Sequence, residues 1–116
     1  DCMRRLSQSL NLFAYDKLVV VFGCYRDKDF KGMLGFISPK AHAIVLTKPQ
    51  SKRAAEVKEL LPFAKAEQVS QASTVAEALK QAEKIAAKED LILVCGSLSV
   101  AREALRHWKI KIKAVC

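Results

Sequence analysis

The chain has 116 residues, enough for one domain with a substantial hydrophobic core and too few for two. Apolar residues make up 51% and charged residues 28%, a balance typical of a globular protein rather than a disordered one. The formal net charge of +8 favours anionic partners, although we expect most of the lysines to lie on a solvated surface.

Several classes of protein are disfavoured by the composition. No apolar run approaches the roughly 20 residues of a membrane-spanning helix, and no signal peptide is indicated. A nucleic-acid binder would explain the positive charge, but aromatic residues are only 7% and no motif for reading RNA or DNA is present. We therefore expect a cytoplasmic protein that binds neither membranes nor nucleic acid.

The elements predicted in the first half of the chain alternate between helix and strand. Apolar residues at helical spacing predict an amphipathic helix over residues 3–13. Residues 18–22 form a continuous, valine-rich run that is typical of a strand buried on both faces. After a polar loop, a second helix is predicted over residues 30–37, ended by Pro39, and a second buried strand over residues 43–46.

The alternation continues in the second half. Ser51 is predicted to cap a helix whose apolar face covers residues 57–61, and a short strand is predicted over residues 66–69. Thr74 and Glu77 form a capping box in front of the clearest helical stripe, which runs over residues 75–86.

A buried strand at residues 91–94 leads through Gly96 and Ser97 into a last helix that ends near Trp108. Residues 109–115 alternate lysine with apolar residues, a pattern that predicts an edge strand. Strands alternating with helices predict a three-layer α/β domain over residues 1–116, with a mostly parallel, Rossmann-like sheet and helices on both faces.

The loops that follow the strands are the predicted site. Right-handed crossovers place them all at the carboxyl edge of the sheet, where ligands bind in such folds. In the first loop, Lys28 between Asp27 and Asp29 suits a carboxylate or phosphate, although Asp29 can instead cap the next helix and Lys28 can be merely solvated.

The second and third loops add weaker candidates. Arg53 is predicted in the first turn of a helix, where a cation interacts unfavourably with the helix dipole. Because this placement is unfavourable, we expect Arg53 to have another role, such as binding an anion or a neighbouring domain. Gly96 and Ser97 offer backbone N–H groups and a hydroxyl at a predicted helix start, which suits an anion.

The residue types needed for catalysis are missing from the sequence. There is no phosphate-binding loop, no dinucleotide-binding glycine motif and no nucleophile with a base beside it. The four cysteines are far apart and are not spaced with His42 or His107 as metal ligands, so we expect reduced thiols and no metal site. We predict that the chain has no catalytic residue of its own.

Three motifs in order resemble the C-terminal domain of folylpolyglutamate synthases and dihydrofolate synthases, in the Mur ligase group. Residues 20–29 are similar to a strand and loop with the Asp-Lys-Asp signature. Residues 46–54 resemble the Thr-x-Pro…Pro-Arg-Ala segment, and residues 93–98 resemble the last strand with its Gly-Ser-Leu turn. The resemblance runs from Leu6 to about Leu105.

The resemblance implies an ATP-dependent ligase in which an N-terminal ATPase domain holds ATP and magnesium. It implies that ATP phosphorylates a folate carboxylate and that the amine of glutamate attacks the acyl phosphate, in one-carbon metabolism. By the same resemblance, Lys28 and Ser97 would contact a glutamate carboxylate. Asp27, Asp29 and Arg53 match signature positions and would contact the nucleotide or the other domain.

The sequence departs from the family pattern at a few positions. The nucleotide-contacting Asp-Gly-Ala-His-Asn-Pro segment would precede Asp1, so Asp1 does not inherit its role. Lys52 stands where a proline is usual, and Ser99 stands near an expected aromatic residue. A related Mur-type ligase with another acyl substrate therefore stays open, as does a stand-alone small-ligand or regulatory α/β domain.

Overall fold

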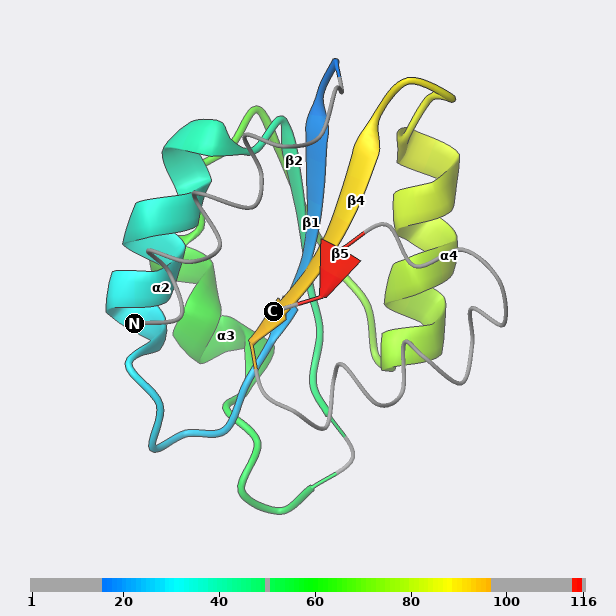
Figure 1. Cartoon of the computed structure of the whole chain (residues 1–116). Coiled ribbons are helices and arrows are strands. Elements are labelled where there is room, and N and C mark those ends of the chain that lie inside the picture. Colours follow the sequence, from blue (N-terminus) through cyan, green and yellow to red (C-terminus); the bar gives the residue numbers. More distant parts are fainter. Residues whose placement is uncertain (1–15, 50, 97–113, 116) are drawn as a thin grey trace.

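The computed structural model describes residues 16–49, 51–96 and 114–115. It contains one parallel sheet with the strand order β3-β2-β1-β4-β5 (Figure 1). The strands are, in chain order, β1 (Leu18–Gly23), β2 (Ala43–Leu46), β3 (Gln68–Gln71), β4 (Leu91–Gly96) and β5 (Ala114–Val115). Each strand is parallel to its neighbour, which confirms the predicted sheet.

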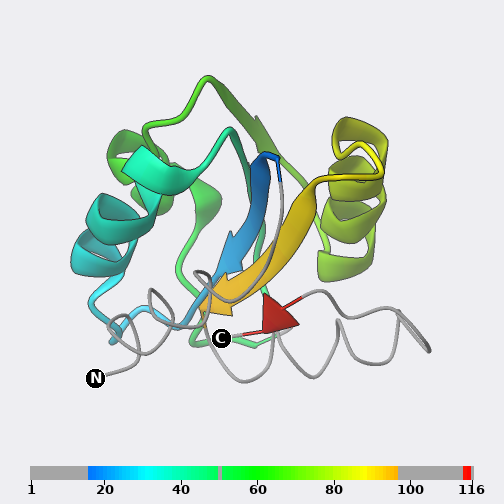
Figure 2. The same ribbon diagram turned by 45° about the horizontal axis from the view of Figure 1, so that its top comes forward.

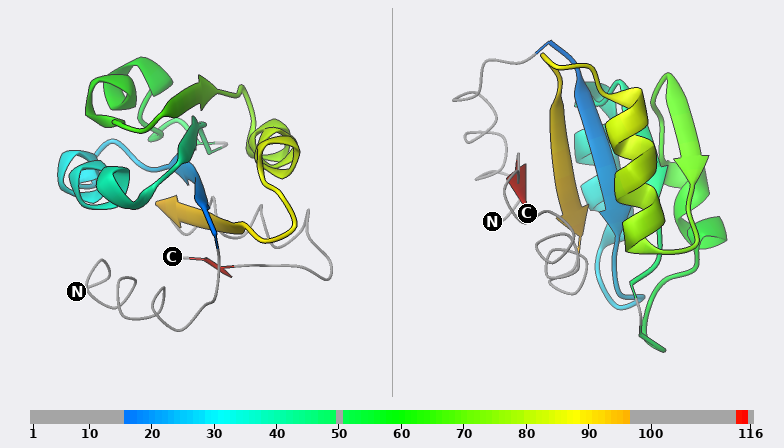
Figure 3. Two further views of the ribbon diagram at one scale, coloured as in Figure 1. Left: turned by 90° about the horizontal axis from the view of Figure 1, so that it is seen from above. Right: turned by 90° about the vertical axis from the view of Figure 1, so that its right-hand side faces the viewer.

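Helices cover both faces of this sheet, as predicted. Figure 3 shows α2 (Phe30–Ile37) and α3 (Val57–Leu60) on one face and α4 (Val75–Ile85) on the other. The central strand, β1, contributes to a hydrophobic core on each face of the sheet, because successive side chains of a strand point to opposite faces. Val20 and Phe22 pack toward α2 and α3, whereas Val19 and Val21 pack toward α4.

Most of the predicted helix boundaries are confirmed. The helix α2 ends at Ile37, and Pro39 lies in the short 3-10 helix η1 (Ser38–Lys40) that follows it. Another 3-10 helix, η2 (Leu61–Phe63), extends α3. Thr74 caps α4, because its Oγ1 accepts a hydrogen bond from the backbone N–H of Glu77 at 3.1 Å.

The predicted start of α3 was wrong. The helix begins at Val57, and its cap is Glu56, which forms a capping box with Glu59. Ser51 instead accepts a hydrogen bond from the backbone N–H of Arg53 at 3.2 Å. Arg53 therefore does not lie in a first helical turn, and the helix-dipole argument for its function does not hold.

The remaining elements fall partly outside the described residues. The third strand, β3, lies two residues later than predicted, at Gln68–Gln71. The last strand, β5, pairs with β4 at the edge of the sheet, in agreement with the predicted edge strand. The predicted helix at 3–13 and the predicted helix after Ser97 lie outside the described part of the chain.

Candidate functional site

The candidate site lies at the carboxyl edge of the sheet, where β1, β2 and β4 end side by side (Figure 2). Phe22 is in register with Leu46, and Gly23 is in register with Gly96. The loops after these strands therefore leave the same edge, as the sequence predicted. Lys28 and Arg53 belong to two of these loops, whereas Ser97 follows β4 directly but lies outside the described residues.

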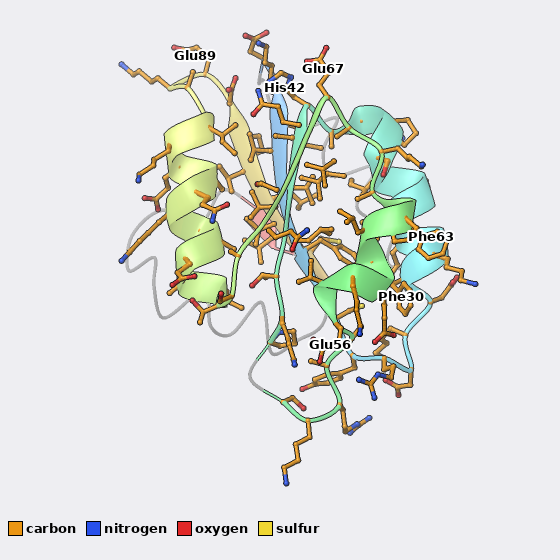
Figure 4. All side chains as sticks on the ribbon, turned by 180° about the vertical axis from the view of Figure 1, so that it is seen from behind. Phe30, His42, Glu56, Phe63, Glu67 and Glu89 are labelled. Atoms are coloured by element: carbon orange, nitrogen blue, oxygen red, sulfur yellow. The ribbon has the colours of Figure 1, made fainter. Side chains whose placement is uncertain are left out.

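The opposite edge of the sheet holds one of the two histidines. Figure 4 shows His42 and Glu67 together at that edge, and Glu56 at the carboxyl edge. His42 Nδ1 lies 3.0 Å from a carboxylate oxygen of Glu67. His42 is thus remote from the candidate site.

The loops after β1 and β2 are joined by their backbones. Tyr25 and Ala54 form an isolated antiparallel bridge. The backbone N–H of Arg26 donates to the carbonyl oxygen of Arg53 at 2.8 Å, and that of Ala55 donates to the carbonyl oxygen of Cys24 at 2.9 Å. The two loops consequently form one unit, a pairing that no pattern in the sequence predicts.

Two of the predicted site residues pair with each other across these loops. The Arg53 guanidinium lies 3.4 Å from the Asp27 carboxylate and 5.1 Å from the ring centre of Tyr25. Both charged side chains are mostly exposed, so the pair adds little stability. It leaves Arg53 and Asp27 at the surface of the edge, with the arginine held over an aromatic ring.

Lys28 and Asp29 have separate roles. Asp29 caps α2, because its Oδ1 accepts a hydrogen bond from the backbone N–H of Gly32 at 3.1 Å, as one of the two interpretations predicted. Lys28 is exposed, and within the described part of the chain its ammonium makes no ion pair. Because Asp27 bonds to Arg53 and Asp29 to a helix, the ammonium of Lys28 is available to a ligand.

Two glycines let the ends of the strands approach closely. Gly96 has a φ of +128°, and a Cβ added there would lie 1.8 Å from the carbonyl oxygen of Gly23. A Cβ on Gly23 would lie 2.8 Å from the carbonyl oxygen of Thr47. Backbone packs directly on backbone at this edge, and this packing fixes the end of β4 at Gly96.

Cys24, at the start of the first loop, is buried and free. Burial raises the pKa of its thiol from 9.0 to about 11, and the charges of Asp27 and Glu59 add to the rise. The thiol therefore stays protonated at neutral pH and is a poor nucleophile. Cys95 is also buried and, within the described residues, forms no disulfide, while Cys2 and Cys116 lie outside them.

The hydroxyl of Thr47 is buried without a hydrogen-bond partner in the described structure. Such a group costs about 1–3 kcal/mol, and an apolar group of the same shape removes that cost. We expect Thr47→Val to raise the free energy of unfolding by about 1 kcal/mol in urea titrations. As a control, Thr74→Val removes the α4 cap and should lower it by about 1 kcal/mol. A loss of stability in Thr47→Val would show that the hydroxyl has a partner.

The chain matches known proteins over most of its length. Residues 1–98 match the model of the family described as Mur ligase, glutamate ligase domain. The chain belongs to this family. It is 31% identical, over 93% of its length, to a probable bifunctional folylpolyglutamate synthase/dihydropteroate synthase of Haloferax volcanii.

Solved structures of Mur ligase family members agree with the fold described above. A bifunctional folylpolyglutamate synthase/dihydrofolate synthase from Yersinia pestis, complexed with AMPPNP and a manganese ion, has a TM-score of 0.83 and 25% identity over 93% of the chain. Folylpolyglutamate synthase of Mycobacterium tuberculosis, complexed with ADP and AMPPCP, has a TM-score of 0.81 and 27% identity over 90% of the chain.

The 116-residue chain is much shorter than these relatives. It spans 13% of the Haloferax volcanii protein and 26% of each of the two crystallised chains. In the described residues, no group of three or more histidine, cysteine, aspartate or glutamate side chains could hold a metal ion. Likewise, no helix among them is long and apolar enough to cross a membrane.

Proposed function

We propose that this chain is the C-terminal domain of an ATP-dependent ligase that adds glutamate to a folate by forming an amide bond. In this proposal the domain helps to bind the glutamate and closes over ATP. Its membership of the glutamate ligase domain family supports the proposal, as do the names of the relatives and the nucleotide analogues in two of their structures.

The observation that carries the proposal is the ammonium of Lys28 at the carboxyl edge, which pairs with no residue that the structure describes. Its loop is held by the bridge to Ala54, and its aspartate neighbours are engaged elsewhere. An ammonium held on a fixed loop suits a carboxylate, which it binds through a charge-assisted hydrogen bond. We assign Lys28 to a carboxylate of glutamate and propose that the hydroxyl of Ser97, after β4, binds the same amino acid.

The other predicted residues receive more indirect roles. Asp27 and Arg53, paired at the surface of the edge, are proposed to face the nucleotide or the neighbouring domain. Asp29 is proposed to act through its cap on α2, which holds the end of the Lys28 loop.

ATP and magnesium are assigned to another part of the full-length protein. The sequence has no phosphate-binding loop, and the described residues have no suitable set of metal ligands. An N-terminal ATPase domain is therefore the proposed partner of this chain, and it would hold both groups. This chain would contribute binding and closure rather than a catalytic residue.

The 116-residue chain alone is expected to have no ATPase or ligase activity. The measurement is phosphate release from ATP with magnesium, glutamate and a folate, next to the same assay with the full-length enzyme as a positive control. Release at background level is expected for the chain alone. Turnover that survives further purification would contradict the proposal that the phosphate-binding machinery lies elsewhere.

A further inference from the structure

The strand β3 forms one edge of the sheet. It is the outermost strand in the strand order, and within the part of the chain that the structure describes it pairs only with β2 (Figure 3, right). Its residues, Gln68–Gln71, include no charged residue and no proline, which commonly prevent an edge strand from pairing with another chain. The edge of β3 therefore suits pairing with a further strand.

The backbone groups of β3 that point away from the sheet follow from its hydrogen bonds. The N–H groups of Gln68 and Ala72 donate to carbonyl oxygens in β2 and just before it, at 3.3 and 2.9 Å. Because successive residues of a strand direct their N–H and C=O groups to alternate sides, those of Val69 and Gln71 point outward. The carbonyl oxygen of Gln71 accepts a hydrogen bond from the side chain of Gln81 at 3.2 Å, and its second lone pair can accept another.

This edge is complementary to itself about a twofold axis at Ser70. Antiparallel pairing about that axis sets Val69 opposite Gln71 of the partner subunit. Both residues direct their N–H and C=O groups outward, so this pair exchanges two backbone hydrogen bonds, and the axis repeats them. Residues 67–68 then face residues 72–73 of the second copy, and no two like charges lie directly opposite each other.

A cation lies on one side of this edge, at the carboxyl end of β3. A cleft of about 340 Å³ lies beside that end, and its walls include Lys58 at the start of α3 and residues 71–73. Within the described residues, Lys58 makes no ion pair. Its ammonium is therefore placed next to whatever lies opposite Ser73.

An anion lies on the same face of the sheet, at the other end of β3. The carboxylate of Glu67 lies 3.0 Å from His42 and is mostly exposed. His42 alternates with Ile44, which packs in the core on the face of α2 and α3, so Glu67 lies on that face too. The twofold axis brings Glu67 of the partner subunit opposite Ser73, on the side of Lys58.

We propose that two copies of this chain pair through β3, antiparallel about a twofold axis at Ser70. The pairing joins the two sheets into one and places Lys58 next to Glu67 of the partner subunit, twice by symmetry. A four-residue strand and two exposed ion pairs make a small interface, so the dimer is weak and reversible. The inference goes beyond the proposed ligase function, because the pairing requires neither ATP nor a folate.

The test measures self-association of the 116-residue chain by sedimentation from micromolar to millimolar concentration, together with amide NMR of the labelled chain. A monomer–dimer equilibrium is expected, with concentration-dependent shifts centred on residues 67–73. Lys58→Glu and Glu67→Lys should each weaken association roughly tenfold, since like charges replace both ion pairs. The double variant, with the two charges exchanged, should associate as the unchanged chain does.

Lys88→Glu is the matched control, because it makes the same change of charge at an exposed position after α4, outside β3 and its flanks. It should associate at least as well as the unchanged chain, since it lowers the net positive charge. A chain that stays monomeric at millimolar concentration would overturn the inference. So would shifts centred elsewhere, an equal loss in Lys88→Glu, or a double variant no better than the single ones.

If a variant at Lys58 or Glu67 lost its dispersed spectrum, substitutions at Ser70 would decide. Ser70 faces its own copy across the axis, so Ser70→Lys alone and Ser70→Asp alone each place two like charges opposite each other and should prevent association. An equimolar mixture of the two variants should form the mixed dimer. A mixture that stayed monomeric would contradict pairing about this axis.

Discussion

Replacing Gly96 by alanine is expected to destabilise the domain by about 3 kcal/mol or more, enough to unfold much of a marginally stable protein. Two costs add at this position. A φ of +128° is a conformation that residues with a Cβ rarely adopt, and it costs about 1–3 kcal/mol. The added Cβ would also lie 1.8 Å from the carbonyl oxygen of Gly23, so the ends of β4 and β1 must move apart.

Gly35→Ala is the control for this change. Gly35 lies within α2, and a Cβ there would have no heavy atom within 4 Å. Alanine should therefore raise the free energy of unfolding by roughly 0.5–1 kcal/mol, through its better helix propensity. Urea unfolding of both variants checks the prediction. If Gly96→Ala stayed within about 1 kcal/mol of the unchanged chain, the close backbone packing at this edge would not be required for stability.

The sheet could be predicted from the sequence because its central strands are buried on both faces. Such strands leave continuous apolar runs, and the runs at β1, β2 and β4 are long enough to be recognised. The predicted position of the short strand β3 differs by two residues from the observed one, because the exposed polar ends of this strand give no periodic signal. The prediction that Ser51 caps α3 is wrong because a serine before an apolar run has the same local pattern whether or not a helix begins there.

The candidate site could be predicted only as far as its location. Parallel topology places the loops of Lys28 and Arg53 at one edge whatever their side chains do. The contacts within that edge depend on pairings between distant residues, such as the bridge of Tyr25 to Ala54 and the ion pair of Asp27 with Arg53. The buried hydroxyl of Thr47 and the cleft beside β3 likewise arise from packing between separate segments, for which a single sequence gives no signal.

Lys28→Ala in the full-length enzyme is expected to raise the glutamate concentration required for half-maximal activity by roughly tenfold to a hundredfold. A charge-assisted hydrogen bond is typically worth about 1.5–3 kcal/mol, and ~1.4 kcal/mol is a factor of ten. Stability should barely change, because the exposed side chain of Lys28 packs against little. The measurement is a glutamate titration at saturating ATP, compared with an ATP titration at saturating glutamate.

Lys52→Ala is the matched control, since Lys52 is an exposed lysine in the neighbouring loop and its loss removes the same charge from the same edge. If both variants weakened glutamate use equally, the effect would come from the overall positive charge of the edge. If Lys28→Ala weakened only the dependence on ATP, Lys28 would face the nucleotide. If neither titration changed, Lys28 would be a solvated loop lysine. If only the glutamate dependence weakens, and only in Lys28→Ala, then Lys28 contacts glutamate directly. Lys28 and Lys52 are both exposed, so the two variants differ mainly in the position of the ammonium that they remove.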